Sequence, residues 1–195
     1  GRAVLALQSL KDCMPDRFEI VEQEALRTHL PSLGKDRGAL PPYVIAANLP
    51  YNIATPLLTG WLEDIHTDEN IYSEMILMFQ KEVAQRIVAK PSTKAYGRLS
   101  VLCQWLCDVK LAFDIPAGAF TPPPKVTSSV VRFVPKEGAA KGIDFKTMES
   151  ITAAAFGQRR KMIRSSLKDY MPYVEACGLR QDARAEEVSV EDFVT

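Results

Sequence analysis

Histidine and cysteine are scarce in this chain of 195 residues, which holds two histidines and four cysteines. His29 and His66 lie far apart, and no cysteine–histidine cluster has the spacing of a zinc site. Cys103 and Cys107 are one helical turn apart in an apolar run, where small buried thiols are expected in a reducing compartment. The sequence therefore offers little ground for a metal centre, for a disulfide framework or for a histidine general base.

Long apolar runs are also lacking. No stretch approaches the roughly 20 apolar residues of a membrane span, and no signal-peptide pattern opens the chain. The 24 lysines and arginines balance 24 acidic residues, which gives a formal net charge of zero. A neutral total does not exclude nucleic acid, because phosphate binding needs only a local basic face. We expect a soluble, cytoplasmic and monomeric protein that does not associate with membranes.

Short apolar runs alternate with helical patterns over residues 1–136. The expected strands are Phe18–Val21, Tyr43–Ala47, Glu74–Phe79, Val109–Ile115 and Ser128–Val134, and the expected helices are Arg2–Cys13, Thr55–Ile65, Lys81–Ala89 and Arg98–Asp108. Residues Thr28–Pro42 are expected to form a loop. The alternation predicts a doubly wound α/β sheet in which the apolar run Tyr43–Ala47 is buried on both faces. The last two strands leave no room for a helix between them and should pair antiparallel.

The character of the sequence changes after Val134. Lys136–Gly142 is rich in glycine, alanine and lysine, as expected of a linker. Residues 143–195 are expected to form a small helical second domain, with helices at Met148–Phe156, Lys161–Leu167, Tyr170–Cys177 and Val190–Val194. The predicted organisation is therefore an α/β domain over residues 1–136 and a helical domain over residues 143–195.

The most informative motif is Asn48-Leu49-Pro50-Tyr51, which directly follows a predicted strand. Ligands of open α/β sheets bind outside the carboxyl ends of the strands. The Asn48 side-chain carbonyl and the Leu49 backbone carbonyl can accept both hydrogens of an adenine amine, and Pro50 stiffens the turn. Tyr51 offers a flat face for an extruded base. The motif favours adenine-N6 chemistry over the alternative of a capped, purely structural turn.

Two further segments converge with this motif. Phe120 opens a proline-rich loop, Phe120–Val126, and is placed to clamp the opposite face of the base; the alternative is a connector with a buried phenylalanine.

A basic run places Arg160 and Arg164 four residues apart on a predicted helix. A phosphate backbone would suit these cations, whereas a solvated charged face is the alternative. The candidate RNA-binding residues are Arg98, Arg159, Arg160, Lys161 and Arg164.

Four segments in register resemble one family. They are 48–58 (NLPYNIATPLL), 94–100 (KAYGRLS), 120–126 (FTPPPKV) and 156–161 (FGQRRK). In order and spacing they closely resemble the KsgA family of small-subunit ribosomal RNA adenine dimethyltransferases, over essentially the whole chain.

The resemblance implies a Rossmann-like methyltransferase that uses S-adenosylmethionine and no metal to form N6,N6-dimethyladenine at two adjacent adenines near the 3′ end of small-subunit ribosomal RNA. It also implies a late role in assembly of that subunit, with a pre-30S-like particle as partner. Asn48 would contact both the methyl donor and the target amine, Tyr51 and Phe120 would hold the base, and the helical domain would face the subunit.

The sequence departs from the family pattern at two places. The strand and glycine-rich loop that cradle the donor are not present, and no Gly-x-Gly occurs, so this segment alone is not expected to bind the donor or to catalyse. In Glu24-Ala25-Leu26, Glu24 stands where the family usually has the aspartate that contacts the donor adenine. The resemblance assigns donor binding to Glu24, Ala25 and Asn48.

Three other functions compete with this interpretation. The antibiotic-resistance branch, which methylates large-subunit RNA, shares the asparagine turn and the phenylalanine loop, but Asn48-Leu-Pro-Tyr-Asn52 fits the small-subunit branch better. A non-catalytic RNA-binding assembly factor is favoured by the missing donor pocket and disfavoured by the intact Asn48–Tyr51 turn. A DNA adenine methyltransferase is a distant third, because no target-recognition domain for duplex DNA is recognisable.

Overall fold

The computed structural model describes residues 2–158 and 160–195. The chain divides into two compact units, and the boundary in the sequence falls between Ala39 and Leu40. The first unit contains helix α1 (Arg2–Cys13), the 3-10 turn η1 (Ala25–Arg27) and helix α2 (Leu30–Asp36). The second unit, Leu40–Thr195, contains the sheet and the C-terminal helices.

Two predictions for the first unit were wrong. Phe18–Val21 is irregular rather than a strand, and the Phe18 N–H donates to the Met14 carbonyl (3.0 Å), which continues the turn that ends α1. Helix α2 lies within the predicted loop. Its second residue is Pro31, which a first helical turn tolerates, and the His29 ring accepts a hydrogen bond from the Ser32 N–H as a cap.

The sheet of the second unit has four strands in the order β1-β2-β4-β3. They are β1 (Tyr43–Asn48), β2 (Tyr72–Gln80), β3 (Cys107–Ile115) and β4 (Ser128–Pro135). β1 pairs parallel with β2, and β4 pairs antiparallel with both β2 and β3, so the predicted antiparallel pair is confirmed. Because β4 runs opposite to the others, the carboxyl ends of β1, β2 and β3 meet at the edge where β4 begins.

The prediction that Tyr43–Ala47 is buried on both faces was wrong. In the described part of the chain β1 is an edge strand, and Val44 is 58% exposed. The interior strand is β2, whose Met75, Leu77 and Phe79 are fully buried. The alanines of β1 made its sequence look uniformly apolar, although alanine is nearly as compatible with a half-exposed position as with a buried one.

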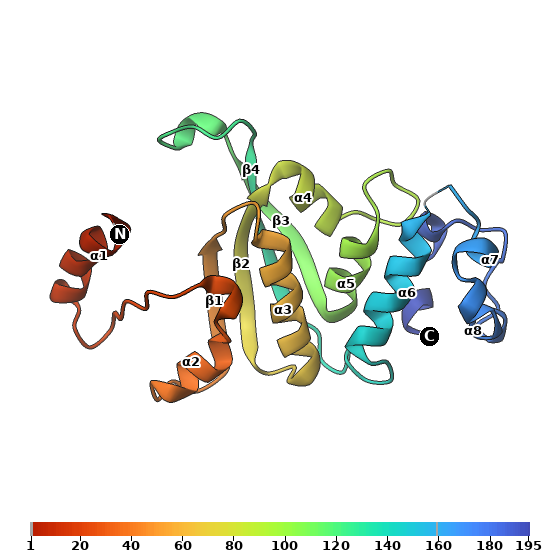
Figure 1. Ribbon diagram of the computed structural model, residues 1–195, viewed down its shortest axis with the longest axis horizontal. Coiled ribbons are helices and arrows are strands. Elements are labelled where there is room, and N and C mark those ends of the chain that lie inside the picture. The colour runs from red at the N-terminus through yellow and green to blue at the C-terminus, as the bar shows by residue number, and fades with distance from the viewer. Residues whose placement is uncertain (1, 159) are drawn as a thin grey trace. The chain divides into compact units, whose positions relative to one another are not determined.

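Helices α3 (Ala54–Thr67), α4 (Lys81–Ile87) and α5 (Arg98–Leu106) cover one face of the sheet (Figure 1). Leu58 and Leu62 of α3 are fully buried, and Phe79 of β2 packs edge-to-face on Phe133 of β4 with 6.3 Å between ring centroids. On the opposite face Val44, Ile76 and Phe113 are exposed. Helix α5 ends at Leu106, two residues before the predicted end at Asp108, and Cys107 is the first residue of β3.

The C-terminal segment is helical, as predicted. It contains α6 (Phe145–Gly157), α7 (Ile163–Ser166), the 3-10 turn η3 (Lys168–Tyr170), α8 (Met171–Ala176), the 3-10 turn η4 (Ala185–Glu187) and α9 (Val190–Val194). α6 packs on α5 (Figure 1), where Phe145 stacks on Trp105 at 6.0 Å between centroids. His66 Nε2 lies 2.8 Å from the Ile143 carbonyl oxygen, so this histidine has a structural role. None of the helices in the described residues is long and apolar enough to cross a membrane.

We expect Leu58→Ala to lower the free energy of unfolding by about 2–5 kcal/mol, because it opens a cavity in a fully buried site. Leu111→Ala on β3, where the side chain is 42% exposed, is the matched control and should cost far less. Urea unfolding followed by circular dichroism measures both variants. Equal losses would show that the face covered by α3 is not the core.

Thiol reactivity should divide the cysteines into two classes. Burial raises the pKa of Cys107 to about 12 and also raises the pKa of Cys103, so both remain protonated thiols at pH 8. Cys13 is exposed and Cys177 half-buried. In the folded chain a disulfide-exchange reagent should modify Cys13 and Cys177, while Cys103 and Cys107 react only in urea. Fast modification of all of them would contradict the structure.

Candidate functional site

The Asn48–Tyr51 turn lies at the carboxyl end of β1, next to the end of β2. Asn48 is the last residue of β1 and pairs with Met78, and its side-chain amide makes no hydrogen bond within the described part of the chain. Leu49 is buried and anchors the turn, while Asn48 and Pro50 are exposed. The Pro50 carbonyl accepts from the Ile53 N–H (3.1 Å), and α3 begins at the next residue. The Asn48 side chain is therefore presented to solvent from a turn that the buried Leu49 anchors.

Tyr51 is exposed, and its side chain is held at the far end. Its side chain is 36% exposed, and its hydroxyl lies 2.8 Å from the Ser128 hydroxyl at the start of β4. One part of the ring is thus open while the phenol end is held by the sheet. Such a ring can serve as a stacking surface.

Phe120 lies in the loop that joins β3 to β4. It is half-buried and follows the 3-10 turn η2 (Ala117–Ala119). The loop extends beyond the end of the sheet (Figure 1). Phe120 and Tyr51 therefore belong to the same edge of the sheet, although no ring contact joins the two among the described residues.

A polar cluster holds the base of this loop. Lys81 Nζ donates to Asp114 Oδ2 and the Ser129 hydroxyl donates to Asp114 Oδ1, each at 2.6 Å. The Lys81 backbone N–H donates to the Thr127 carbonyl (2.9 Å). The hydrogen bonds from Lys81 and then Ser129 hold the pKa of Asp114 below its usual range. Sequence reasoning missed this cluster, whose one signal was the pair of serines opening an otherwise apolar strand.

The two residues assigned to the donor adenine lie in the first unit. Glu24 directly precedes η1, and Ala25 is the first residue of that turn. The Glu24 carboxylate pairs with Arg27 at 3.0 Å, and both side chains are largely exposed. Exposed pairs of this kind contribute little to stability, so the carboxylate can exchange Arg27 for another donor.

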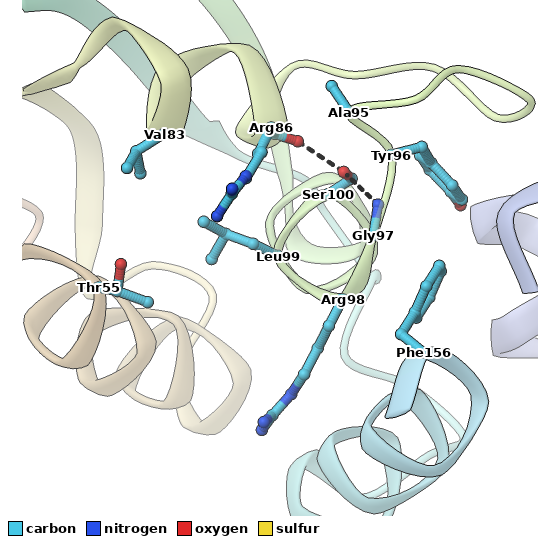
Figure 2. A pocket seen from close by; sticks show the side chains of 10 residues that line it. All are labelled: Thr55, Val83, Arg86, Ala95, Tyr96, Gly97, Arg98, Leu99, Ser100 and Phe156. Carbon is cyan, nitrogen blue, oxygen red and sulfur yellow. Dashed lines mark hydrogen bonds between the residues drawn. The ribbon is translucent and has the colours of Figure 1, made fainter. Parts of the chain in front are cut away.

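Arg98 lines a cavity of about 390 Å³ together with Arg86. Figure 2 shows both arginines between Thr55 of α3 and the Tyr96–Phe156 pair, whose ring centroids are 5.9 Å apart. Arg98 also donates to Glu149 of α6 at 2.7 Å. It therefore links α5 to α6 as well as facing the cavity.

The C-terminal cations are exposed but do not share one helix. α6 ends at Gly157, Arg160 and Lys161 lie in the connection, and Arg164 belongs to α7. The prediction of a common helix was wrong because the chain turns to pair Met162 with Arg184 in an isolated bridge. Arg159 lies outside the described residues. No cluster of possible metal ligands occurs in the part of the chain that the structure describes.

Comparison with known proteins identifies the family and the fold. The family model for ribosomal RNA adenine dimethylase matches residues 5–195. A ribosomal RNA small subunit methyltransferase A of Rhodospirillum rubrum is 48% identical over 98% of this chain and 64% of its own length. The corresponding protein of Bradyrhizobium sp. is 48% identical over 99% of this chain and 67% of its own length. The chain thus spans about two thirds of these relatives.

Two solved structures share the fold. A dimethyladenosine transferase from Plasmodium falciparum superposes with a TM-score of 0.75 at 22% identity, covering 98% of this chain and 76% of its own. The 23S rRNA methyltransferase ErmE superposes with a TM-score of 0.63 at 20% identity, covering 98% of this chain and 75% of its own. The predicted Rossmann-like methyltransferase fold is confirmed. Together with the family match over residues 5–195, this shows that the chain belongs to the ribosomal RNA adenine dimethylase family.

Proposed function

We propose that this chain is the catalytic and RNA-recognition part of an S-adenosylmethionine-dependent enzyme that dimethylates two adjacent adenines near the 3′ end of small-subunit ribosomal RNA. The observation that carries the proposal is the exposed Asn48 amide, which makes no hydrogen bond within the described residues and is followed by the anchored turn through Tyr51. The relatives named small subunit methyltransferase A favour the small-subunit substrate.

The turn can raise the nucleophilicity of an adenine amine without a strong base. The Asn48 side-chain carbonyl and the Leu49 backbone carbonyl accept the two N–H groups, which draws the nitrogen towards tetrahedral geometry and frees its lone pair. The donor supplies a methyl group on a sulfonium, which is electrophilic enough for direct transfer. After transfer the amine carries a positive charge and releases one proton to solvent, so the residues need only orient the base and accept hydrogen bonds.

Aromatic side chains would hold the base in place. Tyr51 would stack on one face of the extruded adenine, and Phe120 would close on the other when the loop meets its substrate. Phe120 is only half-buried, and its loop extends beyond the sheet (Figure 1), so the ring is accessible to such a ligand.

Glu24, Ala25 and Asn48 would contact the methyl donor. A glutamate carboxylate accepts hydrogen bonds from an adenine amine, and the exposed Glu24–Arg27 pair leaves this carboxylate accessible. Asn48 would contact both the methyl donor and the target amine. No metal is required, because the charge of the sulfonium itself activates the methyl group.

Residues 143–195 would form the RNA-facing domain of a monomeric, cytoplasmic enzyme acting on a pre-30S-like particle and contributing to its assembly. Arg160, Lys161 and Arg164 are exposed there and suit a phosphate backbone. Arg159 and Arg98, the first residue of α5, would join them in binding RNA. No similar concentration of arginine occurs elsewhere in the sequence.

One experiment separates these proposals from the alternatives. The chain, and a chimera in which it replaces the matching region of the Rhodospirillum rubrum relative, are incubated with labelled S-adenosylmethionine and unmethylated small or large subunits. Label in small-subunit adenine supports the proposal, whereas label in the large subunit assigns the antibiotic-resistance branch. Binding without transfer by the chimera would favour the non-catalytic assembly factor.

Asn48→Ala in the chimera should lower methyl transfer at least about 100-fold, because it removes an acceptor aimed at the reacting amine. Asn52→Ala is the matched control, since Asn52 is an exposed asparagine in the same turn, and it should transfer methyl groups normally. Thermal unfolding checks that both variants fold. Normal transfer by Asn48→Ala would refute the mechanism.

Replacing Arg160 and Arg164 together with alanine should weaken binding to the small subunit and reduce the slope of log K against log[salt] by about 1.4–1.8, because two phosphate contacts are lost. Lys35→Ala combined with Lys110→Ala removes the same charge from exposed positions in α2 and β3 and should leave the slope unchanged. Filter binding at a series of salt concentrations measures both. Equal slopes for the two double variants would remove this basic segment from the interface.

A further inference from the structure

Two adjacent serines, Ser128 and Ser129, begin strand β4, and both are fully buried. Successive side chains of a strand point to opposite faces of the sheet, so the two hydroxyls meet different neighbours. A buried hydroxyl is costly unless it is hydrogen-bonded, and each of these has a side-chain partner: Tyr51 for Ser128 and Asp114 for Ser129. The pair therefore joins β4 to two different parts of the candidate site.

Ser128 fixes the far end of the Tyr51 ring. The near end is held by the backbone turn, in which Leu49 is buried and the Pro50 carbonyl accepts from Ile53. The hydroxyl–hydroxyl distance of 2.8 Å holds the other end. The phenolic oxygen lies on the long axis of the ring, so constraints at both ends fix the direction of that axis. The position of the exposed ring thus depends on Ser128.

Ser129 holds the loop that carries Phe120. Its hydroxyl donates to Asp114, which lies one residue before the end of β3, where the loop begins. Asp114 accepts from Lys81, whose backbone N–H donates to the Thr127 carbonyl at the end of the loop. Both ends of the loop are therefore fastened to the same point of the sheet.

We propose that Ser128 is a positioning residue for base stacking: its hydroxyl holds the far end, and with it the long axis, of the Tyr51 ring on which the target adenine stacks. Ser129 is its structural counterpart and fastens the loop through Asp114 and Lys81. The inference rests on the proposed function of the Asn48–Tyr51 turn. It adds a residue that contacts neither the base nor the donor and acts only through Tyr51.

A double-mutant cycle tests the proposal. The probe is a single-stranded RNA in which 2-aminopurine replaces one of two adjacent adenines, because the fluorescence of 2-aminopurine falls when it stacks on an aromatic ring. The variants are Ser128→Ala, Tyr51→Phe and their combination, measured in the intact chain at saturating protein. Methyl transfer is measured in the same variants of the chimera described above.

If Ser128 acts through the Tyr51 hydroxyl, the single variants should lose stacking to the same extent, and the combination should lose no more than either. In the chimera each variant should lower kcat about tenfold while KM changes less than about twofold, because the base still binds but is misaligned. Ser128→Thr keeps the hydroxyl and should restore the wild-type values. Tyr51→Phe carries the test if Ser128→Ala does not fold.

Ser129→Ala is the matched control, since it removes a hydroxyl of equal burial from the next residue of β4. Its loss of stacking should be independent of the loss caused by Tyr51→Phe, so the two losses should multiply in the double variant. The proposal is overturned if the stacking losses of Ser128→Ala and Tyr51→Phe also multiply in the double variant. It is likewise overturned if Tyr51→Phe leaves stacking unchanged, or if the intact chain does not quench the fluorescence of the probe. If the chimera transfers no methyl groups while the stacking cycle is non-additive, the proposed reaction fails and the positioning role of Ser128 stands.

Discussion

The antiparallel pairing of β4 between β2 and β3 decides where the polar residues of the site lie. Because β4 runs opposite to the other strands, its first residues pair with the carboxyl ends of β2 and β3, at the edge of the sheet where β1 also ends. Tyr51 and Ser128, which are 77 positions apart in sequence, are thereby brought within hydrogen-bonding distance. If that pairing were lost, Asn48 would keep its turn, but Tyr51 and the phenylalanine loop would have no common support.

The edge combines rigid and accessible groups in a way that suits chemistry on a base. Leu49, Ser128 and Ser129 are buried and hold the surrounding chain, while the Asn48 amide and part of the Tyr51 ring face outward. A methyl transfer that needs only aligned acceptors and a stacking surface depends on such fixed geometry more than on shifted acidity. This explains how a chain with so few histidines can support the proposed reaction.

The sequence predicted the class of fold and most elements of the second unit, because the apolar runs of β2 to β4 and the helical patterns of α3 to α5 are long and strongly periodic. It also singled out the asparagine turn. It failed where contacts with other segments decide the structure: Phe18–Val21 has the composition of a strand but is irregular, and β1 is exposed at Val44. The roles of Ser128 and Asp114 could not be predicted, because they depend on strand register, which composition does not reveal.

Register also constrains the site of this chain. Ser128 and Ser129 face opposite sides of the sheet, so a slip of one residue between β4 and its neighbours changes the side chain at each of the two positions. If Ser129 took the place of Ser128, Val130 would take the place of Ser129, and Asp114 would lose its hydroxyl donor. The loop from Pro116 to Thr127 can change in composition, and even in length, without this effect. A single insertion between Ser129 and Val130 would also remove the serine that faces Asp114, although it would leave every named residue in the sequence.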